Sequence, residues 1–99
     1  MHPDFMTDPM DQMRKMLDLT MRREQAKMLA IKRFSAIVVN SPRDQWDTLI
    51  DAEIANANVA QDVQDAFVKQ LRDSLDNYKR VYEDAQRFLR DQAKRKGDT

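Results

Sequence analysis

The sequence predicts an all-α protein, built as a helical hairpin that extends into an elongated three-helix bundle. Turn-forming residues are scarce, because the 99 residues contain one Gly and three Pro, which leaves little material for the tight turns of a sheet. Apolar residues recur every three or four positions over long stretches, and this is the helical period. The bases equal the acids in number, so the high net charge typical of disordered chains is missing. We expect helices over about 9–39, 42–56 and 58–95.

A single helical domain is expected over 9–96, between a flexible leader (1–8) and a flexible tail (97–99). The pair Asp8-Pro9 marks the start of the first helix. An Asp side chain in the N-cap position accepts a hydrogen bond from a free backbone N–H. Pro suits the first helical position, where its missing N–H is not needed.

The first predicted helix carries an apolar face with one polar gap, at Glu24. The residues of this face are Met10, Met13, Leu17, Met21, Met28 and Ile31. Between Met28 and Val39 apolar side chains cover most of the circumference. A helix that is apolar nearly all round is expected to be buried on several sides.

The segment from Asn40 to Asp44 is the clearest break in the sequence. Asn40 can end the first helix, Ser41 can cap the second, and Pro42 fits its first position. Asp44 stands where the acid of a capping box is expected. Because this linker is short, the two helices should fold back on each other as a hairpin. The predicted core around the turn comprises Phe34, Ile37, Val38, Trp46 and Ile50.

A second interruption is predicted near Asn56–Asn58, because two Asn residues so close together are poor helix formers. Asn58 could cap a new helix, with Gln61 three residues later. The alternative is one continuous helix, since the apolar spacing runs unbroken from Trp46 to Leu89. A kink or short break is the favoured interpretation.

The composition argues against several kinds of chemistry. Cys is absent and the sole His is His2, so neither a thiol nucleophile nor the ligands of common zinc sites are available. We expect no enzyme activity, no cofactor and no metal site. No apolar run approaches the roughly 20 residues that a membrane span needs. The first residues lack a basic region followed by an apolar core, so a cytoplasmic protein is expected.

Two surfaces are candidates for contacts with other chains. Two long helices and one short helix cannot cover each other's apolar faces evenly, so a homo-oligomer is expected, most simply a dimer with coiled-coil-like packing. Its candidate interface residues are Tyr78, Tyr82, Phe88 and Leu89. Met residues adapt to varied partners, and all seven lie within the first 28 residues. The candidate residues for binding an unidentified protein partner are Met10, Met13, Met16, Leu17 and Met21.

The predicted function is therefore a non-enzymatic helical interaction module, such as an adaptor, an inhibitor or an accessory factor. One alternative is a nucleic-acid-binding protein that uses the bases of the first and last helices. Acids are interleaved with those bases, and six acids accompany one base between Pro42 and Val68, which weakens the field that a phosphate backbone would feel. A second alternative is a structural subunit of a homo-oligomeric assembly.

Overall fold

The computed structural model describes residues 8–97, and these residues contain helices and connecting segments but no strand. The predicted all-α class is confirmed, and all three predicted helices are present. The predicted leader and tail lie outside the described residues, except for Asp8 and Gly97. The elements in chain order are α1 (Pro9–Asn40), the 3-10 helix η2 (Arg43–Gln45), α2 (Trp46–Asn56), the 3-10 helix η3 (Gln61–Val63) and α3 (Gln64–Gly97).

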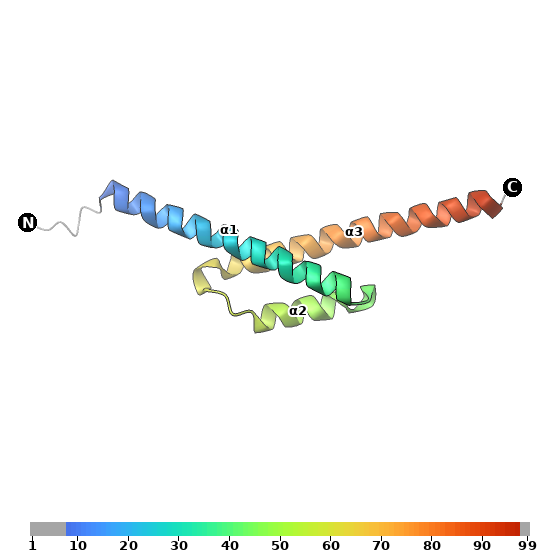
Figure 1. Ribbon diagram of the computed structural model, residues 1–99, viewed down its shortest axis with the longest axis horizontal. Helices are drawn as coiled ribbons and strands as arrows, with labels where there is room; N and C mark the ends of the chain where they lie inside the picture. The colour runs from blue at the N-terminus through green and yellow to red at the C-terminus, as the bar shows by residue number, and fades with distance from the viewer. Residues whose placement is uncertain (1–7, 98–99) are drawn as a thin grey trace, which may run out of the picture.

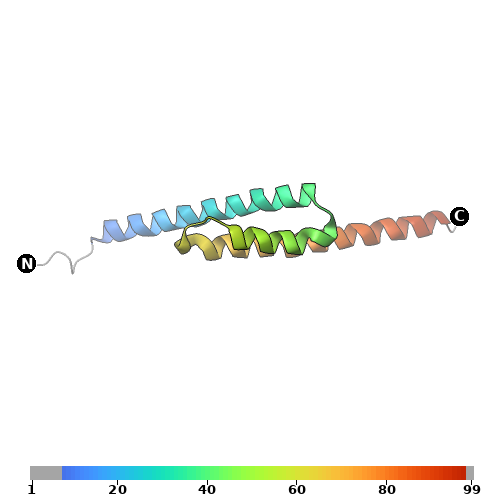
Figure 2. The same cartoon turned by 90° about the horizontal axis from the view of Figure 1, so that it is seen from below.

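The three helices form a short bundle from which two long ends project. α1 and α3 run in the same direction, and the C-terminal half of α1 lies across the N-terminal half of α3 (Figure 1). The shorter α2 runs back along both of them (Figure 2). The fold measures 87 × 26 × 15 Å, with a radius of gyration of 21.2 Å, whereas a compact domain of this length has about 13 Å. Much of each long helix is therefore out of reach of the others.

The start of α1 is the one that the sequence predicts. The backbone N–H of Met10 donates to Oδ1 of Asp8 over 3.1 Å, and Pro9 occupies the first helical turn. At the other end of the helix, the Asn40 side-chain amide donates to the carbonyl of Ala36 over 2.9 Å. This bond occupies one of the carbonyls that a helix end leaves without a backbone donor.

The predicted capping of the second helix by Ser41 and Asp44 is wrong. Neither η2 nor α2 has a side-chain cap, and η2 supplies a tight turn before α2 begins at Trp46. The Ser41 carbonyl instead accepts a hydrogen bond of 3.1 Å from the Trp46 indole N–H. Trp46 is thus attached to the end of α1 by its side chain, and this contact closes the hairpin.

The predicted break near Asn56–Asn58 is confirmed, and the continuous-helix alternative is excluded. α2 ends at Asn56 and the backbone is extended at Ala57. The 3-10 turn η3 begins at Gln61, and α3 follows from Gln64. The expected cap by Asn58 is wrong, because Ala60 occupies the N-cap position of η3 and makes no side-chain hydrogen bond. The chain must reverse here to bring α3 back along α1, and buried Val63 packs into the core just after the reversal.

The core lies where the three helices meet. Its buried residues are Ala26, Ala30 and Phe34 from α1, Trp46 and Ile50 from α2, Val63 from η3, and Phe67, Leu71 and Leu75 from α3. Of the five core residues predicted around the turn, Phe34, Trp46 and Ile50 are buried, and Ile37 and Val38 are half-buried against them. The fully buried side chains of Ile50, Phe67 and Leu71 mark its centre.

Candidate interaction surface

The helix α1 has two apolar faces, and only one of them faces the core. Ala26, Ala30 and Phe34 follow each other at intervals of four and are buried. Since successive helical residues are roughly 100° apart, Met28 lies about 160° around the helix from Ala30. The second face is exposed along its whole length. We call it the methionine stripe, and it consists of Met10, Met13, Leu17, Met21, Met28 and Ile31.

The expectation that α1 is buried on several sides near its C-terminal end is wrong. Met28 is 71% exposed, Ile31 47% and Val39 82%. α2 and α3 both pack on the side of Ala30 and Phe34, so no described segment covers the side of Met28 and Val39. The periodic face that the sequence shows most clearly is therefore an open surface along its whole length.

The N-terminal part of α1 lies beyond the rest of the bundle (Figure 1). Its residues 9–21 form an overhang. Met10, Met13, Leu17 and Met21 each expose 61–62% of their surface, and Met16, beside the stripe, exposes 69%. All five residues predicted for partner binding thus lie together on this overhang and are open to solvent. Met13, Met16, Leu17 and Thr20 line a shallow hollow of about 250 Å³.

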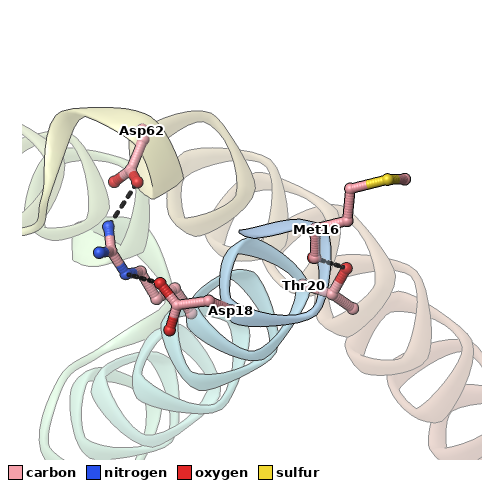
Figure 3. A network of polar contacts seen from close by, with 5 residues as sticks. Met16, Asp18, Thr20 and Asp62 are labelled. Carbon is pink, nitrogen blue, oxygen red and sulfur yellow. Dashed lines mark hydrogen bonds and ion pairs between the residues drawn. The ribbon is translucent and has the colours of Figure 1, made fainter. Parts of the chain in front are cut away.

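An ion-pair network lies at the base of this overhang. Arg22 contacts Asp18 at 3.3 Å on its own helix and Asp62 at 2.6 Å on η3, both measured from nitrogen to oxygen. Figure 3 shows Asp18 and Asp62 on the opposite side of α1 from the Met16 side chain. These charged contacts join α1 to η3 on the side of the helix that faces away from Met16.

An apolar groove continues the methionine stripe at its C-terminal end. It runs between α1 and α3 and has a volume of about 330 Å³. Ile31, Val38 and Val39 line it from α1, and Tyr78 and Val81 from α3. The sequence-based prediction named neither Val39 nor Val81 as a contact residue. Val81 lies one position before Tyr82, outside the main apolar face of α3. The continuous apolar run at the end of α1 was the available signal for Val39.

The four residues predicted for an oligomer interface fall into two groups. Tyr78 and Tyr82 contact Trp46 edge-on, with ring centroids 5.2 and 5.6 Å apart. These two rings therefore support the monomer's own core, although Tyr78 is also partly exposed. Phe88 and Leu89 lie on the free C-terminal part of α3, where both are exposed. Only this second pair lies on a surface without a described neighbour.

Acidic residues from the middle of the sequence form ion pairs with bases of the neighbouring helices. Three ion pairs join α2 to its neighbours, with nitrogen–oxygen distances of 3.4 Å for Arg33–Glu53, 3.6 Å for Arg72–Asp51 and 2.6 Å for Lys79–Asp47. A hydrogen bond from Lys79, with the nearby charges of Lys79 and Arg43, holds the pKa of Asp47 below its ordinary value. Bases that could have faced a phosphate backbone are thus partly neutralised by the protein's own acids.

Within residues 8–97, no three acidic, His or Cys side chains gather in a way that could hold a metal ion. No helix in this range combines the length and the apolar character needed to cross a membrane. Comparison of the chain with protein-family models, with curated proteins and with solved structures gave no match.

Proposed function

We propose that this protein is a non-enzymatic helical interaction module whose contact surface is the methionine stripe together with the adjoining groove. The observation that carries the proposal is the double-faced character of α1. Its core contacts use Ala26, Ala30 and Phe34, while a second face with helical period stays exposed over the whole helix. A structural helix needs only the first face, so the second is available for another chain.

The energetic argument rests on the exposed apolar area. Fully burying one Leu or Met side chain contributes about 1.5–3 kcal/mol, which at about 25 cal/mol per Å² corresponds to roughly 60–120 Å². Seven large apolar side chains on this side of α1, from Met10 to Val39, expose between 47% and 82% of their surface. Together they present roughly 270–540 Å². A contiguous apolar patch of that size on a monomer is often a functional surface.

The chemistry of the stripe suits helical partners. Unbranched Met side chains adapt their shape to what they contact, and surfaces rich in Met can repack against different partners. The groove between α1 and α3 is lined mainly by apolar side chains, together with Ser35, Ser74 and Asn77. An amphipathic helix can lay its apolar face into such a groove. The proposed mode of action is therefore helix-on-helix and helix-in-groove contact.

Site-specific photo-crosslinking in the native cell tests the proposal. A photoreactive amino acid replaces Leu17 on the stripe in one variant and Lys15 on the opposite face of the overhang in the other. We expect discrete crosslinked products from position 17 that position 15 does not give, because only the stripe makes a specific contact. No adduct from either position, or the same adducts from both, would contradict the proposal.

A further inference from the structure

We propose that the occupant of the stripe is a second copy of this chain, packed antiparallel so that the two α1 helices meet along it. This inference rests on the proposed function, because it takes the stripe to be a contact surface and names its partner. The symmetry axis passes between Glu24 and Gln25, near the middle of α1.

The spacing of the exposed face is that of a coiled-coil seam. From Met10 the positions advance by three or four residues at each step to Val38 and Val39, and two of them, Glu24 and Ser35, are polar. This repeat continues over about four heptads, a length at which coiled-coil packing is expected. The core-facing line of α1 has a different spacing, four residues between each of Ala26, Ala30 and Phe34. The seam is thus a separate feature of the helix.

The seam is self-complementary only when the two helices run in opposite directions. A residue of one copy then faces the residue of the other copy that lies equally far from the axis, to within one position. Met10 meets Val39, Leu17 meets Ile31, and Met21 meets Met28, and each of these apolar pairs occurs twice in the dimer. Met13 lies opposite the small residues Ser35 and Ala36. The overhang of each copy enters the groove of the other and contacts its α3 wall at Val81. In a parallel pair the overhangs would meet each other and the grooves would stay open.

Charge and area agree with this arrangement. Asp18 and Lys32 lie about 40° apart around α1, on the same flank of the seam. Antiparallel pairing brings Lys32 of one copy near Asp18 of the other, twice per dimer, and this carboxylate also contacts Arg22 of its own helix at 3.3 Å. Lys32 makes no ion pair within residues 8–97, so its ammonium is available. A standard interface buries about 800 Å² per partner, of which about 65% is apolar in homodimers, or roughly 500 Å². The apolar area on this side of α1 is of that size.

Glu24 has a defined place in this dimer. It is the one charged residue within the seam, and its carboxylate contacts Lys27 of its own helix at 3.2 Å. A single polar residue in a coiled-coil seam fixes the register and orientation and weakens the association. Near the axis, the two Glu24 side chains lie close to each other and keep the seam from sliding by a turn.

The chain contains no Cys, so single-Cys variants report the register directly. Leu17→Cys and Ile31→Cys chains are mixed and oxidised gently, and the disulfides are identified by mass spectrometry. We expect the mixed 17–31 product to form well ahead of either self-linked product. In the antiparallel dimer, two copies of position 17 lie about 22 Å apart along the helix axis. Lys15→Cys, on the opposite face, serves as the control that should not crosslink.

Sedimentation equilibrium of the full chain gives the second measurement. We expect twice the 11.7 kDa mass of one chain, with dissociation on dilution. Leu17→Asp should raise the dissociation constant roughly 100-fold, since two seam positions lose their apolar contact. Glu24→Leu should lower it, and Lys15→Asp should leave it within a few-fold. Circular dichroism of each variant checks that the helices remain folded.

Three results would overturn the dimer. The first is a monomeric mass at every protein concentration. The second is a 17–17 disulfide that forms as fast as the 17–31 disulfide. The third is a folded Leu17→Asp variant whose dissociation constant is unchanged. The photo-crosslinking experiment separates this failure from failure of the proposed function. A monomeric protein whose position 17 crosslinks to a different chain in the cell would retain the interaction role with another partner.

Discussion

Trp46 is the side chain through which the hairpin turn and the core depend on each other. It is 4% exposed, and its indole N–H donates to the Ser41 carbonyl at the end of α1. Its ring meets Tyr78 and Tyr82 of α3 edge-on, and the Arg43 guanidinium lies 5.3 Å from its centroid. Trp46 therefore contacts the end of α1, the η2 turn and α3.

Trp46→Ala should lower the free energy of unfolding by about 3–5 kcal/mol, the usual loss when a buried aromatic side chain is truncated. A domain of this length has about 5–15 kcal/mol in total, and a core of nine buried residues places this protein toward the lower end. Trp46→Phe keeps the ring contacts but loses the indole hydrogen bond, so the expected loss is only about 1–2 kcal/mol.

Urea unfolding followed by circular dichroism measures both variants, because the tryptophan signal itself is removed. With a slope of about 1–3 kcal/mol per M, the midpoint of Trp46→Ala should fall by about 2 M. All samples need the same protein concentration, since association makes apparent stability concentration-dependent. A loss of less than about 1 kcal/mol for Trp46→Ala would be close to the effect of a surface substitution. That result would refute the assignment of Trp46 as the link between turn and core.

Three further substitutions test packing and charge. Ala30→Leu should lower the free energy of unfolding, measured by thermal unfolding, by about 1–3 kcal/mol, because the fully buried Ala30 has no room for added methylenes. The control Ala36→Leu, at an exposed position, should not lower it. Because the pKa of Asp47 is lowered in the folded state, its ion pair stabilises the fold above its ordinary pKa and is lost as the pH falls through the lowered value. Asp47→Asn should therefore lose less stability than the parent chain on acidification below about pH 4, as measured by urea unfolding at each pH. Asp62→Asn should change stability by less than about 1 kcal/mol in urea, because its pair with Arg22 is about half exposed on both sides; a larger loss would mean that this pair holds the overhang in place.

The positions of the helix ends follow from local sequence. Asp8 and Pro9 start α1 as predicted, and the chain breaks at Ser41–Pro42 and again after Asn56. These features depend on residues a few positions apart, so the sequence expresses them directly. The predicted caps at Ser41, Asp44 and Asn58 were wrong, since two short 3-10 turns replaced them. How the chain turns between helices depends on where the next helix must pack.

The sequence alone thus determined that the protein is helical, where its first helix starts and near which residues the chain breaks, because capping and the helical period are local properties. It also revealed that the methionines form an ordered face. Only the tertiary structure decided which face of α1 is inside. Periodicity records that apolar residues line up, but it does not say what they meet. Small Ala26 and Ala30 let α1 approach its neighbours closely, and residues 9–21 extend past the start of α3, so the methionine stripe stays at the surface.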